Sequence, residues 1–175
     1  MLKKIFAILA ALVVVILLVA TTKPDSFQIR RSASIKAVPD SIWPYLDDFH
    51  NWPAWSPWEG MDTTMTRTYS GAPSGVGAVY AWSGNKKVGT GRMEITGAEP
   101  PSSLTIALDF LAPFESHNTA NFTLAASGDS TTVTWTMSGP SPFLTKVMSV
   151  FVSMDRMVGP DFEAGLANLK RVVEH

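Results

Sequence analysis

The chain has 175 residues, of which 46% are hydrophobic, and its 14 basic and 15 acidic side chains give a formal net charge of −1. Apart from a hydrophobic leader, this length suits one domain of about 150 residues with a sizeable core. Without the leader lysines Lys3, Lys4 and Lys23 the acids outnumber the bases, which argues against nucleic acid as a partner. The absence of cysteine excludes disulfides, thiolate metal sites and a cysteine nucleophile.

The leader is an unbroken apolar run from Ile5 to Ala20, preceded by Lys3 and Lys4. As a helix this run spans roughly 24 Å, which is short of the roughly 30 Å hydrocarbon core unless Leu2 and the threonines after Ala20 contribute. We expect residues 1–23 to be an uncleaved signal anchor that crosses the membrane through residues 5–22. The two lysines favour a single-pass topology with the domain, residues 24–175, on the extracytoplasmic side. A cleaved signal peptide, giving a secreted or periplasmic domain, is the alternative.

The domain begins with an alternating pattern from Phe27 to Ala37 that predicts a half-buried strand. Arg31 falls on its apolar face, and we interpret it as an edge arginine whose head reaches water rather than as a buried ion pair. A short helix is expected from Pro39 to Leu46. In the segment that follows, which contains Trp52, Trp55 and Trp58, two prolines exclude a long regular helix.

Five further strands are expected, separated by turn residues that favour successive hairpins and therefore an antiparallel meander. The cluster Gly89-Thr90-Gly91 lies inside the second of these patterns, where a bulge or a close helix approach explains it better than a phosphate site. The expected strands are residues 75–83, 87–99, 104–110, 115–126 and 131–137.

The last element is an amphipathic helix over about Met157 to Val173, and its apolar stripe needs the curved sheet as a partner. Pro160 is tolerated in a first turn, so we expect this helix to start or kink there. A separate methionine-rich helical piece is expected over residues 142–154. The predicted fold class is α+β: a curved antiparallel β-sheet wrapped around a long C-terminal α-helix, plus an N-terminal transmembrane helix.

Several short sequence motifs of this chain resemble those of a known family. They are Trp55-Ser56-Pro57-Trp58, Gly75-Val76-Gly77 with Tyr80-Ala81-Trp82, Val133-Thr134-Trp135, and Met154-Asp155 leading to Asp161-Phe162-Glu163 and Asn168-Leu169-Lys170. With the order of elements, they resemble the START-like polyketide cyclase/dehydrase family, or SRPBCC superfamily, over residues 27–174. The resemblance implies a helix-grip fold with an apolar cavity between sheet and C-terminal helix, but no particular reaction.

The residues offer no strong catalytic constellation. His117 is interpreted as a solvent-facing histidine beside Glu115 rather than as a general base, and Asp155 as a cap or solvated start of the closing helix rather than as a buried functional carboxylate. No pair of histidines has ligand spacing and no G-x-S-x-G motif is present, so we expect no metal, no cofactor and no serine catalysis.

What remains is an apolar lining on the inward faces, which either fills the core or surrounds a cavity. The candidate lining residues are Tyr80, Trp82, Leu108, Phe110, Phe122, Trp135, Met137, Met157, Val158 and Phe162.

Three hypotheses for function follow from this lining. The leading one is a membrane-anchored domain that binds a hydrophobic small molecule, such as a lipid or a polyketide-like compound. The second is a cyclase, dehydratase or hydrolase in which Tyr80, His117 or Asp155 transfers a proton. The third is an envelope interaction module with a filled core, whose three clustered tryptophans face a protein or the bilayer interface.

Overall fold

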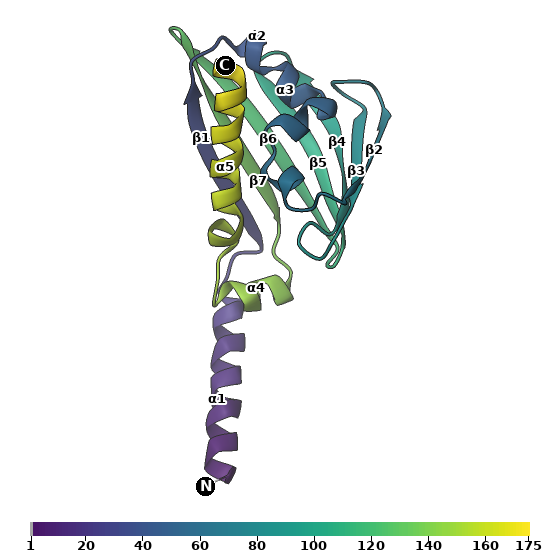
Figure 1. Ribbon diagram of the computed structural model, residues 1–175. Coiled ribbons are helices and arrows are strands. Elements are labelled where there is room, and N and C mark those ends of the chain that lie inside the picture. Colours follow the sequence, from purple (N-terminus) through teal and green to yellow (C-terminus); the bar gives the residue numbers. More distant parts are fainter. Residues whose placement is uncertain (1) are drawn as a thin grey trace.

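The computed structural model describes residues 2–175 and consists of an N-terminal helix, a seven-stranded sheet and a C-terminal helix that lies across the sheet (Figure 1). Every neighbouring pair of strands is antiparallel, in the order β1-β7-β6-β5-β4-β3-β2. The strands are β1 (Ser26–Ile35), β2 (Thr66–Gly71), β3 (Ala78–Ser83), β4 (Thr90–Glu99), β5 (Ser103–Ala112), β6 (Ser116–Ser127) and β7 (Ser130–Pro140). The predicted meander and the α+β helix-grip fold are therefore confirmed.

The sequence analysis missed one strand, β2. It forms the edge of the sheet beside β3, with Tyr69 opposite Tyr80. Its residues are mostly polar and half-buried or exposed, so the strand has no apolar row for a period-two pattern to detect. The bulge expected near Gly89-Thr90-Gly91 is present, because the pairing of β4 with β5 shifts register between Thr90 and Gly91.

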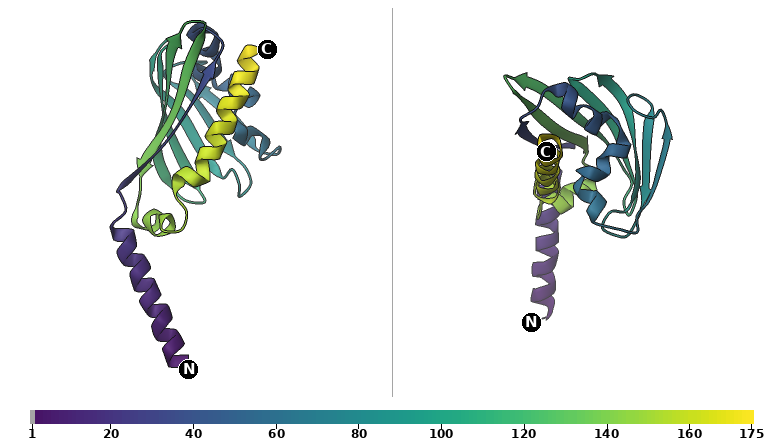
Figure 2. Two further views of the ribbon diagram at one scale, coloured as in Figure 1. Left: turned by 90° about the vertical axis from the view of Figure 1, so that its left-hand side faces the viewer. Right: turned by 45° about the horizontal axis from the view of Figure 1, so that its top comes forward.

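The C-terminal helix α5 (Met154–Glu174) crosses the concave side of the sheet and packs along β1 (Figure 2). Of the two alternatives expected at Pro160, a start or a kink, the start is wrong, because α5 begins six residues earlier, where the Ser153 side chain accepts a hydrogen bond from the Arg156 backbone. Pro160 cannot donate to the carbonyl of Arg156, but it lies on the exposed side of α5, where water can replace that bond.

Short helices between β1 and β2 cover the rest of the concave side (Figure 2). Leu46, Phe49, Trp52 and Trp55 come from this region and are all buried. The helices are α2 (Pro39–Ile42), α3 (Pro44–Asp47) and the 3-10 helices η1 (Phe49–Ala54) and η2 (Pro57–Gly60). The concave side is therefore closed by two unequal covers, α5 on the β1 and β7 side and the short helices on the rest.

The N-terminal helix α1 (Leu2–Thr21) is long and apolar enough to span a membrane or to serve as a signal sequence. Its 20 residues rise about 30 Å, more than the leader run alone predicts, because residues 2–4 and Thr21 extend the helix. Near its C-terminal end, the buried Ala20 marks where it meets α4 (Phe143–Ser149). The contact is reinforced beyond α1, where Lys146 of α4 pairs with Asp25 and the Ser141 backbone N–H donates to the Asp25 carbonyl at 2.7 Å.

Candidate functional site

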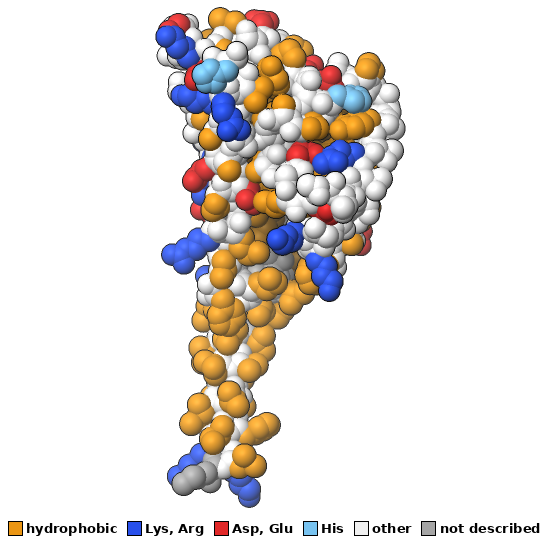
Figure 3. All heavy atoms as spheres, in the orientation of Figure 1, with side chains coloured by type: hydrophobic (Ala, Val, Ile, Leu, Met, Phe, Trp, Pro, Cys, Tyr) orange, Lys and Arg blue, Asp and Glu red, His pale blue; other side chains and the backbone are white. Residues whose placement is uncertain are grey.

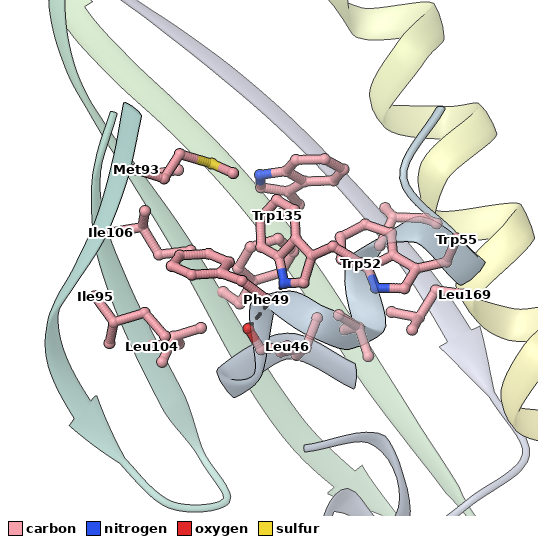
Figure 4. Packing of buried hydrophobic residues seen from close by; sticks show 14 of the residues in the cluster. Leu46, Phe49, Trp52, Trp55, Met93, Ile95, Leu104, Ile106, Trp135 and Leu169 are labelled. Atoms are coloured by element: carbon pink, nitrogen blue, oxygen red, sulfur yellow. Dashed lines mark hydrogen bonds between the residues drawn. The ribbon is translucent and has the colours of Figure 1, made fainter. Parts of the chain in front are cut away.

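The space between the sheet and α5 is occupied by a group of stacked aromatic rings centred on Trp135 of β7. The Trp135 ring lies nearly parallel to that of Phe162 from α5, with centroids 4.0 Å apart, and stacks on Phe122 of β6 at 4.9 Å. Ring edges of three further tryptophans meet Trp135 at centroid distances of 5.5 to 6.4 Å: Trp52, Trp55 and Trp58. Figure 4 shows three of these rings, those of Trp52, Trp55 and Trp135, packed among aliphatic side chains of the core. We call these six residues the aromatic cluster.

One polar atom inside this cluster has no partner. The indole nitrogens of Trp52 and Trp55 donate to the carbonyls of Leu46 at 3.1 Å and Tyr45 at 2.8 Å. The Trp135 Nε1 is equally buried but has no acceptor among the described residues. A buried donor left unpaired costs roughly 1–3 kcal/mol. A ligand oxygen that accepts a hydrogen bond from Trp135 Nε1 would therefore remove this cost and gain that free energy in binding.

A second group lies at the other end of the concave side and is polar. Glu59 of η2 accepts a hydrogen bond from the Tyr80 hydroxyl at 2.7 Å and pairs with Arg67 of β2 at 2.6 Å. Burial and the bond to Glu59 together raise the pKa of Tyr80 far above its usual value, so this phenol stays a neutral donor. The bond to Glu59 likewise raises the pKa of Arg67. Glu59 and Arg67 were not predicted from the sequence, because Arg67 lies on β2, whose pairing with the strand of Tyr80, β3, was not predicted.

The structure brings most of the predicted lining residues to the concave side. Six of them are buried: Tyr80, Leu108, Phe122, Trp135, Met137 and Phe162. Trp82, Phe110 and Val158 are half-buried and pack against this core. Met157 does not join them; it is 49% exposed and lies on the outside of α5, because its position on the helix faces α4 rather than the sheet.

Met157 instead lines an open, wholly apolar hollow of about 360 Å³ with Met148, Phe151 and Val152. A smaller hollow of about 150 Å³ lies near His50 and Tyr69 at the opposite end of the sheet. Both hollows lie outside the space between sheet and α5, where the aromatic rings pack against one another.

The other predicted candidates lie away from the concave side. His117 is exposed on the outer face, as expected, but its nearer carboxylate is Asp109 of the neighbouring strand at 2.8 Å rather than Glu115 at 3.4 Å. Hydrogen bonding to Asp109 raises the pKa of His117. Asp155 does not cap α5, since Ser153 does; it pairs with Arg31 at 2.7 Å.

The interpretation of Arg31 also needs correction. Its guanidinium is held between Asp155 and Glu163, the latter at 2.6 Å, and only 24% of its side chain is exposed. Because α5 lies along β1, the arginine meets two carboxylates that are more than 120 residues away in the sequence. Arg31 is thus an ion-paired residue of the β1–α5 contact.

The tryptophans of the segment after α3 are mostly core. Trp52 and Trp55 are buried, and only Trp58 is half-buried at the edge between η2 and α5. The hypothesis of an interaction module that presents three exposed tryptophans is therefore wrong.

Comparisons with known proteins agree with this architecture. No curated protein matches the chain. Among solved structures, the Aha1 dimer from Colwellia psychrerythraea is 18% identical, with a TM-score of 0.60 over 85% of this chain and 96% of the other. MLL2253 from Mesorhizobium loti is also 18% identical, with a TM-score of 0.59 over 85% and 97% of the two chains. DynU16, from the dynemicin biosynthetic locus, is 20% identical, with a TM-score of 0.56 over 87% of this chain and 48% of its own.

At these identities the structural matches establish the fold alone. A family model described as "polyketide cyclase / dehydrase and lipid transport" matches residues 26–174, which is nearly the whole chain after α1. The aromatic cluster, Glu59 and α5 all lie within the matched range. By this match the chain belongs to the polyketide cyclase/dehydrase and lipid transport family.

Proposed function

We propose that residues 24–175 bind a hydrophobic small molecule, a lipid or a polyketide-like compound, between the concave side of the sheet and α5. We further propose that residues 1–23 remain as a single-pass anchor that holds this domain on the extracytoplasmic side of a membrane. The family description names both lipid transport and cyclase or dehydrase chemistry, and α1 has the length and hydropathy of a membrane span. We place the domain boundary after residue 23, in the connection between the end of α1 at Thr21 and the start of β1 at Ser26.

The observation that carries this proposal is the unpartnered Trp135 Nε1 in the middle of an otherwise apolar lining. A ligand with a hydrocarbon body and one carbonyl or hydroxyl oxygen would satisfy it. Such a ligand suits the adaptable side chains of Met93 and Met137, which are buried in the same core.

Binding requires the aromatic rings to part. Trp58 is suited to move first, because it is half-buried at the edge of the cluster and touches Trp135 and Phe162 only edge to face, at 5.6 and 6.0 Å. Rotation of its ring would open a path between η2 and α5 to Trp135. The closed arrangement is then the ligand-free state.

The buried pair of Glu59 and Tyr80 favours a second candidate function, acid–base chemistry on the bound compound. Glu59 is a carboxylate with 9% of its side chain exposed, and it faces the same concave side as the aromatic cluster. A Glu59→Gln change would remove a proton-accepting group with little change in shape. Loss of turnover with retained ligand binding would assign this role to Glu59.

The test begins with the full chain, purified in mild detergent from its own host and examined by native mass spectrometry and organic extraction. A stoichiometric apolar compound is expected. Uptake of two probes, a fatty alcohol and the matching alkane, is then compared for Trp135→Phe, which keeps an aromatic ring but removes the N–H. Losing one buried hydrogen bond of about 1–3 kcal/mol should weaken binding of the alcohol roughly 5- to 150-fold and leave binding of the alkane within a few-fold.

Trp82→Phe is the matched control, because the Trp82 indole donates to the carbonyl of Val88 within its own hairpin at 3.0 Å. This variant should preserve the discrimination between alcohol and alkane. A chain that carries no compound and takes up neither probe would contradict the proposal.

A further inference from the structure

The end of the domain beside α1 exposes a set of large apolar side chains that the fold does not use. They lie on α4, on the loop after it and on the first turn of α5, and each is between 45 and 66% exposed. We call them the apolar end: Phe143, Leu144, Met148, Phe151, Val152 and Met157. Figure 3 shows hydrophobic side chains continuing from α1 onto the lower end of the domain. A contiguous patch of this kind on a folded domain marks an interaction surface.

The position of α1 identifies the occupant of this surface. Only residues 22–25 separate α1 from β1, and the pairing of Lys146 with Asp25 fixes α4 beside this junction. The C-terminal end of a membrane-spanning α1 lies at the bilayer surface. The apolar end must then lie at that surface too.

A second apolar contact reaches the same level. Antiparallel pairing puts the β5–β6 turn at the same end of the sheet as the start of β1 and the end of β7. The last residues of β5 and this turn expose Leu111 and Phe114. The domain would therefore contact the bilayer at two separated apolar points. Two contacts fix the tilt of the domain relative to the membrane plane, whereas a single contact would leave it free.

Charges around these contacts suit phospholipid headgroups. Lys86 and Lys87 lie exposed in the β3–β4 turn at this end, and Arg156 is exposed beside Met157. None of them forms an ion pair with another described residue. Of the acids here, Asp25 pairs with Lys146, Asp155 with Arg31, and Glu115 lies near His117. Asp62 accepts a hydrogen bond from the backbone of Asn85 in the β3–β4 turn and so adds one negative charge beside the two lysines. The three unpaired cations outnumber it, and they can attract anionic headgroups.

We infer that the apolar end and the β5–β6 turn rest in the headgroup region of an anionic bilayer, the same bilayer that α1 enters. This inference rests on the proposed anchor. It gives the proposed binding domain a fixed orientation, in which the hollow bounded by Met148, Phe151 and Met157 opens directly onto lipid.

Because the chain has no cysteine, single introduced cysteines can report depth in the membrane. The full chain is reconstituted in nanodiscs of phosphatidylcholine and phosphatidylglycerol, with an NBD fluorophore at Phe151→Cys, Phe114→Cys or Asp129→Cys. Asp129 is the control, since it is exposed in the β6–β7 turn at the opposite end of the sheet. Nitroxide-labelled lipids should quench the first two labels severalfold and leave the third unchanged.

The inference is overturned if labels at positions 151 and 114 stay as accessible to aqueous iodide as the label at 129. A disulfide-linked dimer through position 151, in place of lipid quenching, would likewise overturn it by assigning the surface to a second copy. A Lys86→Glu, Lys87→Glu double variant should reduce quenching at 114 in anionic discs and leave it unchanged in phosphatidylcholine alone. If the double variant showed the same quenching at 114 as the wild-type lysines in anionic discs, the proposed attraction of Lys86 and Lys87 to anionic headgroups would be overturned.

Extraction of host membranes with alkaline carbonate tests the anchor separately. A chain that resists extraction but shows no quenching at 151 keeps the anchor and loses the bilayer contact. Quenching at 151 in a chain that carbonate removes keeps the contact and overturns α1 as a permanent span.

Discussion

The two halves of α5 are attached to the sheet in different ways. The first half, residues 154–161, meets β1 through the ion pair of Arg31 with Asp155, and its Met157 faces outward. About two turns after Asp155, just beyond this half, Glu163 binds the same guanidinium. The second half buries Phe162, Leu166 and Leu169 against the core. Apolar burial depends little on pH or on moderate salt concentrations, whereas half-exposed ion pairs are screened by salt and lost with protonation. The attachment of the second half should therefore persist when salt or pH changes, and that of the first half should weaken in part.

The largest effect is expected when apolar packing in the second half is reduced. Leu169 is fully buried, so Leu169→Ala should lower the free energy of unfolding by about 2–5 kcal/mol. Met157→Ala, on the same helix but exposed, should change it by less than about 0.5 kcal/mol. Urea unfolding of the full chain in detergent, followed by tryptophan fluorescence, measures both. Equal losses would remove the distinction between the halves.

Two glycines in α5 extend the comparison, because a Cβ added at either one would meet a neighbouring side chain. The neighbours differ in how easily they can move aside. A Cβ at Gly165 would lie 2.9 Å from the Trp135 ring and 3.1 Å from Pro57, both rigid. Gly165→Ala should therefore destabilise by about 1–3 kcal/mol through overpacking, partly offset by better helix propensity.

At Gly159 the new Cβ would lie 2.1 Å from Arg31 Nη2, the end of a flexible side chain. Gly159→Ala should push the guanidinium aside and break its ion pairs, at a cost of about 0–1 kcal/mol that a helix gain of similar size offsets. Stability at low salt should then be nearly unchanged, and its dependence on salt concentration should fall. A loss as large as that of Gly165→Ala would show that Arg31 cannot move.

The smallest effect concerns pH and Asp155. The hydrogen bond from Arg31 holds the pKa of this carboxyl below its usual range in the folded chain. A lowered folded pKa contributes stability that is present above the unfolded value of about 3.9 and is lost as pH falls through the folded value. The stability difference between the wild type and Asp155→Asn should thus be constant above about pH 5 and shrink below about pH 4. A difference that grows as pH falls would contradict this assignment.

The sheet could be predicted from sequence because its strands alternate cleanly. Leu104, Ile106 and Leu108 are an example, since each inward position is buried in the structure. Phe122 and Trp135 were assigned inward on the same grounds and Phe162 from the apolar stripe of the C-terminal helix, and the Trp135 ring stacks on both phenylalanines. Periodicity shows which face of a strand or helix points inward, but it does not show which other element packs against that face.

The misses share a physical cause, since they depend on contacts between distant segments. Arg31 was interpreted as an edge residue because the residues near it in the sequence do not predict its contacts with Asp155 and Glu163. Glu59 was not among the candidates, because its partner Arg67 comes from the unpredicted strand β2. Whether an apolar ring lines a space or fills it depends on side-chain packing across elements, which a pattern along one element does not contain.

The short connection between α1 and β1 limits how the proposed domain could deliver cargo. Residues 22–25 could extend by at most about 14 Å even if they were released from their contacts. The sheet adds roughly 36 Å of height, the length of the 11-residue strand β7. A domain anchored in this way cannot carry a molecule across an aqueous gap that is wider than the sum of these two lengths. Its exchange would be confined to one membrane plane, where the supply of ligand is set by surface density and any acceptor must come to it.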